Sequence, residues 1–170
     1  MKKLLVLSCA AGAAVVISSA ALLAAFKVEA NKENVVASRI EGQWQRSADL
    51  TERLTGQQQP KQGGLMSFKN DPSVAGKIPA KYEEIEVMRS RKVYMAGTMS
   101  YRGRDYPFIL VEMNGNPHIV YFRDKEGEPM GDAESFNVML APAKDPADDL
   151  LFIGGDFNNQ PFTAYERMKQ

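Results

Sequence analysis

Short hydrophobic runs separated by turn residues fill most of the chain after residue 90. Val93–Tyr101 is rich in strand-forming residues, Arg102–Asp105 supplies a polar turn, and Tyr106–Met113 resumes the hydrophobic run. Strand-forming residues bounded by turn residues in this way are typical of paired β-strands. We therefore predict an antiparallel hairpin across these residues.

The dipeptide Asn114-Gly115 is the strongest local signal in the chain, because both residues tolerate the positive φ of a type I′ hairpin turn. Pro117 follows at a strand start, where its missing N–H costs least. Polar loops are expected at Asp124–Asp132 and Ala141–Asp149. The remaining hydrophobic runs predict strands at His118–Arg123, Ser135–Leu140, Leu150–Ile153 and Phe162–Arg167.

The first half of the chain carries weaker patterns. Ile40, Gly42 and Trp44 alternate with polar residues, which predicts a strand at 40–46 with one buried face. Residues 55–79 are rich in Gln, Gly, Pro and Lys, so we expect a long mobile loop anchored by residues 65–68. Residues 34–39 are compatible with a short helix, and residues 82–89 fit a helix or a strand, with the strand favoured by the meander that follows.

Seven or eight short strands with few helix signals predict an all-β fold. Its strands form an antiparallel meander that closes into a small barrel or packs as a two-layer sandwich. Tyr106–Val111 and Ile119–Phe122 are apolar on both strand faces, so a second layer must cover the outer face. The loop at 65–68, a helix or another copy of the chain are the candidates for that layer.

The N-terminal segment is expected to direct the chain to a membrane. Leu4–Phe26 is 23 residues without a charge, preceded by Lys2 and Lys3, and as a helix it is long enough to cross a hydrocarbon core of about 30 Å. Val28-Glu29-Ala30 resembles a cleavage site, so residues 1–30 are expected to be a signal peptide or a retained transmembrane helix. Either alternative makes residues 31–170 a single extracytoplasmic β domain, periplasmic or secreted or anchored to the membrane.

The composition of this domain argues against some kinds of partner and some kinds of stabilising bond. Residues 31–170 carry 18 basic and 20 acidic residues, and this near-neutral balance argues against nucleic acid as a partner. The single cysteine, Cys9, lies in the N-terminal segment. The domain therefore depends on apolar burial rather than on disulfides or thiolate metal sites.

Gly42-Gln43-Trp44 on the first strand, together with Arg167 on the last, resembles the lipocalin and wider calycin pattern. In that family the tryptophan lies across the barrel floor and a basic residue from near the chain end packs over its ring. The resemblance implies structural roles for Gly42, Trp44 and Arg167, an apolar barrel interior, and small hydrophobic molecules as cargo. The nearest match is a reduced lipocalin-like domain of the kind found in small exported bacterial proteins.

The chain offers few residues that could catalyse a reaction. His118 is the only histidine, and no Gly-x-Ser-x-Gly nucleophile motif occurs. Met95 and Met99 are better explained as core residues than as soft-metal ligands, and the acidic residues at 124–132 miss the spacing of a calcium loop. We therefore expect no enzyme activity, no catalytic residues, no bound metal and no cofactor.

Aromatic residues in the predicted strands are the only hint of a ligand. Strand parity does not show which of them face inward, and the short chain favours a filled core over a cavity. The leading hypothesis is a non-enzymatic lipocalin-like domain that binds a small apolar ligand. The alternative is an envelope interaction module that docks a partner protein, or a second copy, on an exposed apolar sheet face. The candidate ligand contacts are Tyr94, Tyr106, Phe108, Phe122 and Phe136.

Overall fold

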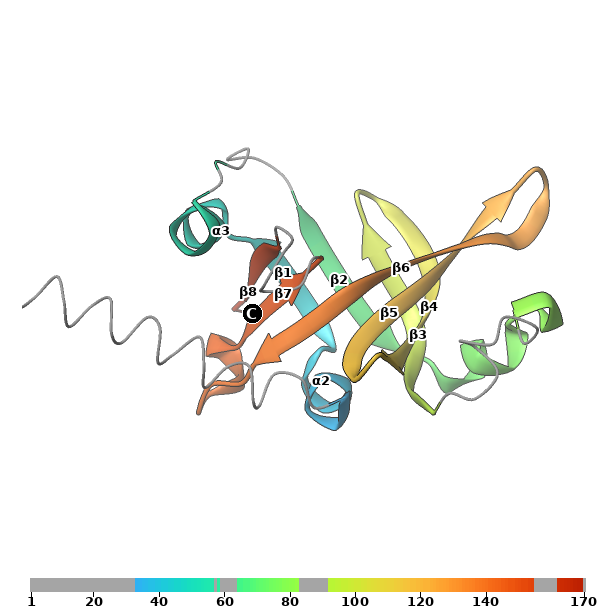
Figure 1. Ribbon diagram of the computed structural model, residues 1–170, viewed down its shortest axis with the longest axis horizontal. Coiled ribbons are helices and arrows are strands. Elements are labelled where there is room, and N and C mark those ends of the chain that lie inside the picture. Colours follow the sequence, from blue (N-terminus) through green and yellow to red (C-terminus); the bar gives the residue numbers. More distant parts are fainter. Residues whose placement is uncertain (1–32, 57, 59–63, 83–91, 155–161, 170) are drawn as a thin grey trace, which may run out of the picture.

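The protein forms a closed barrel of eight antiparallel strands that are hydrogen-bonded in chain order (Figure 1). The computed structural model describes residues 33–56, 58, 64–82, 92–154 and 162–169. The strands are β1 (Gly42–Arg46), β2 (Leu65–Asn70), β3 (Val93–Tyr101), β4 (Arg104–Met113), β5 (Asn116–Lys125), β6 (Glu128–Ala141), β7 (Leu150–Ile153) and β8 (Thr163–Arg167). The predicted all-β meander and the barrel are confirmed, and the two-layer sandwich is wrong.

In the described part of the chain, five short helical elements accompany the strands. They are the α-helices α2 (Glu33–Arg39) and α3 (Ala48–Thr55) and the 3₁₀ elements η1 (Pro72–Lys77), η2 (Ala80–Tyr82) and η3 (Pro146–Asp148). The predicted N-terminal hydrophobic helix, and with it the choice between signal peptide and anchor, lies outside the described residues.

Strand β1 closes the barrel by pairing on both of its sides. Trp44 lies opposite Met66 of β2 on one side and opposite Arg167 of β8 on the other. With β8 paired to β1, every strand of the barrel has a neighbouring strand on both sides. Closure also brings residues from the two ends of the sequence into direct contact.

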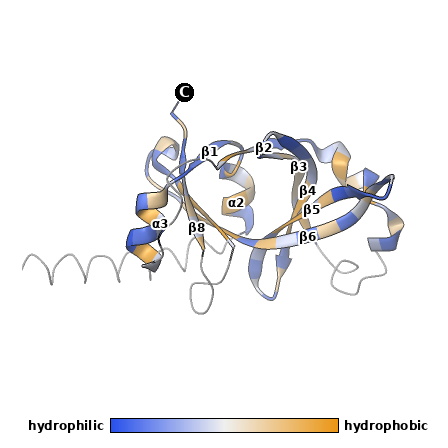
Figure 2. Ribbon diagram, turned by 90° about the horizontal axis from the view of Figure 1, so that it is seen from above, coloured by the Kyte–Doolittle hydropathy of each residue, from blue (hydrophilic) through white to orange (hydrophobic). Residues whose placement is uncertain are grey.

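Helix α2 covers one end of the barrel. Seen from above, it lies inside the outline of the strand ring (Figure 2). Val36 of the helix and Ile40, which follows its last residue, are fully buried in the interior core with Trp44. The strands supply the rest of this core: Met66, Phe68, Met95, Met99, Phe108, Leu110, Ile119, Val138, Leu140, Leu151 and Tyr165.

The outer face of β3, β4 and β5 is covered by the chain itself. Val74 of η1 and Tyr82 of η2 pack with Ile109, Val120 and Phe122 in a second apolar cluster. The Tyr82 and Phe122 rings lie 5.2 Å apart, and the Tyr82 hydroxyl donates a hydrogen bond to the carbonyl of residue 130. Residues 72–82 therefore form the second layer that the two-sided apolar strands require.

Helix α3, which the sequence pattern did not predict, covers the outer face near β8. Leu50 and Leu54 pack against a third cluster that includes Phe152 and Phe162. Gly56 follows the last residue of the helix, and its φ of 70° and its N–H bond to the carbonyl of Glu52 form a left-handed C-cap. Both outer apolar patches are thus covered by segments of this chain. The large hydrophobic residues that stay exposed in the described ranges are Leu65, Val93 and Met168.

The expected mobile loop at 55–79 is wrong over residues 65–77, which form β2 and η1; residues 57 and 59–63 lie outside the described part. Met66 and Phe68 are buried and alternate with polar residues. This short strand pattern is hard to detect in the sequence because Gln- and Gly-rich residues precede it. The close approach of β2 to β3 depends on Gly97 of β3, where an added Cβ would lie 1.9 Å from the carbonyl oxygen of Lys69 on β2. This contact fixes β2 in the barrel wall.

Two-residue turns with positive φ connect successive strands of the meander. Asn114 and Gly115 have φ of 55° and 75°, which confirms the predicted turn. The expected charged loop at 124–132 is wrong: β5 and β6 continue to a two-residue turn at 126–127, with φ of 53° and 82°. The strand expected at 82–89 falls on residues outside the described ranges, except that Tyr82 ends η2.

Candidate functional site

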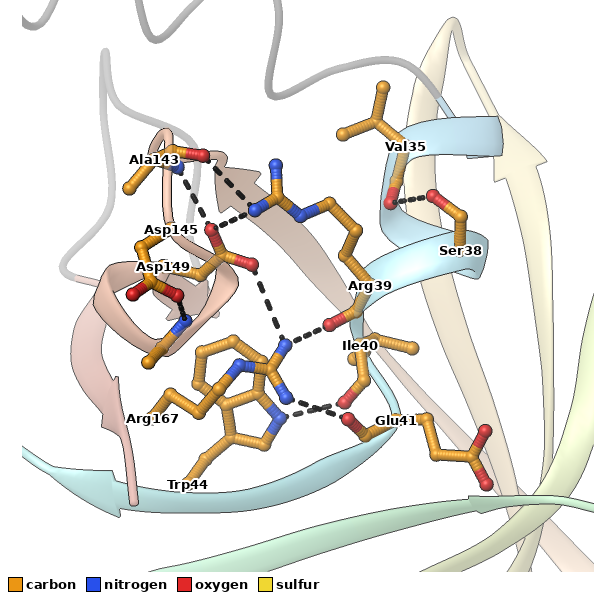
Figure 3. Close-up of polar contacts among 11 residues, drawn as sticks. Val35, Ser38, Arg39, Ile40, Glu41, Trp44, Ala143, Asp145, Asp149 and Arg167 are labelled. Carbon is orange, nitrogen blue, oxygen red and sulfur yellow. Dashed lines mark hydrogen bonds and ion pairs between the residues drawn. The ribbon is translucent and has the colours of Figure 1, made fainter. Parts of the chain in front are cut away.

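The covered end of the barrel is built around Trp44. Its side chain is fully buried, and its indole Nε1–H donates a hydrogen bond of 2.7 Å to the carbonyl oxygen of Ile40 (Figure 3). The guanidinium carbon of Arg167 lies 4.2 Å from the ring centroid. At this distance the cation and the indole face attract each other, so Arg167 seals the floor of the barrel.

Gly42 leaves room for that guanidinium. Its φ is 125°, and an added Cβ would lie 2.8 Å from Nη1 of Arg167. Arg167 Nη1 donates a hydrogen bond of 2.7 Å to the carbonyl of Glu41, and Nη2 donates to the carbonyl of Arg39. The structure thus brings Gly42, Trp44 and Arg167 together as one structural unit that touches the C-terminal end of α2.

A buried carboxylate completes the unit. Asp149 is fully buried, and its Oδ1 lies 2.8 Å from Nη2 of Arg39 and accepts a hydrogen bond of 2.9 Å from the backbone N–H of Ala143 (Figure 3). Arg167 Nη2 lies 3.6 Å from Oδ2 of the same carboxylate. Two cations therefore hold one buried anion between α2 and β8. The sequence placed Asp149 in a solvated polar loop, and no local pattern distinguished it from its neighbours Asp145 and Asp148.

The opposite end of the barrel is open and contains a pocket of about 590 Å³. On β4 and β5 the pocket residues lie one inward position away from core residues: Tyr106 precedes Phe108 on β4, and Tyr121 follows Ile119 on β5. The pocket is lined by Met66, Met99, Tyr101, Arg102, Arg104, Tyr106, Tyr121, Arg123, Phe136, Ile153, Thr163 and Tyr165. The predicted filled core is therefore right at the α2 end and wrong at this end.

Aromatic rings form a continuous wall on one side of the pocket. The rings of Tyr106 and Tyr121 lie 5.5 Å apart in an edge-to-face arrangement, and the rings of Tyr121 and Phe136 lie 5.8 Å apart. Such pairs are held by ring quadrupoles as well as by burial. The wall therefore combines a fixed apolar surface with phenol hydroxyls.

Two phenols of the pocket have pKa values well above the usual range. Burial, followed by a hydrogen bond to Glu134, raises the pKa of Tyr121 to about 12. Burial also raises the pKa of Tyr165 to about 12. Both hydroxyls stay protonated at neutral pH and present neutral groups to a ligand.

Only two of the five predicted ligand residues line the pocket, namely Tyr106 and Phe136. Phe108 is buried in the interior core against Phe68, with ring centroids 5.5 Å apart. Phe122 faces outward and packs on Tyr82, so it does not line the pocket.

Tyr94 packs against the interior core with Lys92 Nζ 4.8 Å from its ring centroid, away from the pocket lining. Met66, Met99, Tyr101, Tyr121 and Tyr165 also line the pocket and were not among the five predicted contacts. Met66, Tyr101 and Tyr121 share strand faces with the core residues Phe68, Met99 and Ile119, each two positions away, but that parity becomes visible only once one inward residue is known.

Comparisons of this chain with protein-family models, with curated proteins and with solved structures found no match. The likeness to lipocalins thus rests on the closed eight-stranded barrel and on the packing of Arg167 over Trp44. Among the described residues, no helix is long and apolar enough to cross a membrane. That part of the chain also contains no group of three or more His, Cys, Asp or Glu side chains placed to hold a metal ion.

Proposed function

We propose that this protein is a non-enzymatic, lipocalin-like binding domain that holds a small apolar molecule in the open end of its barrel. The observation that carries the proposal is the pocket of about 590 Å³ inside a closed barrel wall. Its volume lies within the range of about 300–1,000 Å³ found for small-molecule sites. Burial of an apolar ligand against this wall supplies the binding free energy.

The composition of the wall supports an apolar ligand. Phe136, Met66, Met99 and Ile153 offer carbon and sulfur surface, and methionine side chains adapt to ligands of different shape. The other end of the barrel is blocked by Trp44 and α2, which leaves the mouth at the Tyr101 end as the route for the ligand. The proposal includes the extracytoplasmic location expected from the sequence, with residues 1–30 acting as a signal peptide or as a membrane anchor.

The docking alternative has less support. It requires an exposed apolar sheet face, and the two apolar outer patches are packed under residues 72–82 and under α3. No observation on the described surface favours a protein partner or a second copy.

The test is a titration of the full-length protein, held in lipid nanodiscs, with the neutral probe decanol. Methionine methyl groups labelled with ¹³C report the position of the probe, because Met66 and Met99 line the pocket and Met168 is exposed elsewhere. We expect saturable shifts of the Met66 and Met99 signals and none at Met168. Equal, non-saturating shifts at all three, or none at all, would contradict the proposal.

A matched pair of variants separates pocket binding from surface effects. Thr163→Trp places an indole in the pocket and should abolish the shifts, since Thr163 lines it. Ser67→Trp adds the same ring on the outer face of β2, between the inward residues Met66 and Phe68, and should leave the titration unchanged.

A further inference from the structure

We propose that the pocket selects a single-chain amphiphile with an anionic head group, whose head is bound by Arg102 and Arg104 at the mouth and whose tail lies inside. This inference deepens the proposed function and rests on it. It adds a head-group preference that the apolar wall alone does not provide.

The β3–β4 turn delivers the two arginines to the pocket. Arg102 and Gly103 have φ of 52° and 74°, the geometry of a tight two-residue hairpin turn. Arg102 and Arg104 therefore flank one hairpin tip, and both are exposed side chains that line the pocket. A ligand that enters the open end passes between them and the wall.

The three arginines that line the pocket differ in whether they have an ion-pair partner. Arg123, the third arginine of the lining, is matched by Asp132 at 2.8 Å and Glu134 at 2.5 Å. Within the described ranges neither Arg102 nor Arg104 has an ion-pair partner, and the pocket lining includes no Asp or Glu. The mouth thus holds two cations available to a ligand.

Arg102 is held in a position that keeps its donors accessible. Its guanidinium carbon lies 5.1 Å from the Tyr101 ring centroid. A guanidinium held over a ring face keeps the N–H groups along its edges for an oxyanion. Carboxylates and phosphates are the anions whose geometry matches that fork.

Below the arginines the pocket changes to apolar surface. Phe136, Met66, Met99 and Ile153 contribute no charge, and Tyr165 contributes a neutral phenol next to them. A molecule that matches this order has an anion at one end and a hydrocarbon chain at the other. A cationic head would meet Arg102 and Arg104 as like charges.

The experiment compares probes that share one ten-carbon chain: decanoate, decyl phosphate, decanol and decyltrimethylammonium, each below its micelle concentration. The full-length protein in nanodiscs is titrated, and affinity is read from the Met66 and Met99 methyl signals. We expect an anionic probe to bind about tenfold more tightly than decanol, and the cation to bind most weakly. The ratio of decanoate to decyl phosphate tells a carboxylate head from a phosphate head.

Variants assign the preference to the two arginines. Arg102→Asn with Arg104→Gln should bring the anionic probes to the affinity of decanol, and asparagine tolerates the positive φ at residue 102. The double variant with lysine at both positions should retain most of the preference. Arg53→Gln with Lys69→Gln removes the same charge from exposed positions outside the pocket lining and should change nothing.

The outcomes separate the two proposals. If decanol binds as tightly as decanoate and decyl phosphate, or if the arginine variants keep the preference, the head-group inference is wrong and the pocket function stands. If no probe shifts Met66 or Met99, the proposed function fails and the inference fails with it.

Discussion

The guanidinium of Arg167 lies over the indole of Trp44, with 4.2 Å between its carbon and the ring centroid. The two residues are also register partners across the β1–β8 seam that closes the barrel. One contact therefore seals the floor and fastens the last strand to the first. Its loss affects closure as well as local packing.

Trp44→Ala should lower the free energy of unfolding by about 3–5 kcal/mol, because it removes a fully buried indole and leaves a cavity under α2. Urea unfolding followed by circular dichroism measures the change. A loss below about 1 kcal/mol would show that the indole is not a principal part of the core.

Asp149→Ala should cost about 3–5 kcal/mol, because Arg39 and Arg167 would face each other without the buried anion between them. Asp148→Ala is the matched control, since the Asp148 side chain is 59% exposed and pairs with the exposed Lys169. Its effect should stay within about 0.5 kcal/mol. Equal effects of the two substitutions in thermal or urea unfolding would contradict the buried network.

Gly97→Ala should destabilise the protein by about 3 kcal/mol or more, since its Cβ would lie 1.9 Å from the Lys69 carbonyl oxygen and push β2 from β3. Gly76→Ala is the control, because nothing lies within 4 Å of a Cβ there. Hydrogen exchange of the β2 amides should accelerate in Gly97→Ala alone. Unchanged exchange would mean that β2 is not held against β3 as described.

Stability should fall in alkaline solution partly through Tyr165. Burial raises the pKa of Tyr165 from 10.0 to about 12, so the folded state holds the phenol proton more tightly than the unfolded state. The contribution of the neutral phenol is present below pH 10 and is lost as the pH rises through 12, by about 2–3 kcal/mol.

Tyr165→Phe isolates this contribution from other groups that titrate in the same range, Tyr121 included. Urea midpoints of the two proteins should keep a constant difference up to about pH 9. The wild type should then lose stability relative to Tyr165→Phe between pH 10 and 12. A difference that stays constant to pH 12 would place the Tyr165 hydroxyl in water.

The sequence predicted the parts of the fold that depend on neighbouring residues. Asn114-Gly115 marks its turn by chemistry alone, and Val93–Tyr101 and Tyr106–Met113 pair across a short connection. Strand β2 escaped prediction because only Met66 and Phe68 mark it within a polar segment. The strand is stabilised by pairing with β1 and β3, which are distant in sequence, and the local composition does not predict that pairing.

The pocket was less predictable than the barrel. Tyr106 and Phe122 both lie in apolar strands, yet one lines the pocket and the other packs outside under Tyr82. A shift of one residue in register exchanges the two faces of a strand, so aromatic content does not reveal the inner face. The burial of Asp149 could not be predicted for a related reason, because its ion-pair partners Arg39 and Arg167 lie on elements distant in sequence.

Intermolecular nuclear Overhauser effects between bound decanol and the protein test directly whether the barrel holds a ligand in its open end. The account predicts cross-peaks from the alkyl chain to the rings of Tyr106 and Phe136 and to the methyl groups of Met66 and Met99. Cross-peaks to Phe122 on the outer face instead, or an alkyl chain that contacts only lipid, would contradict it.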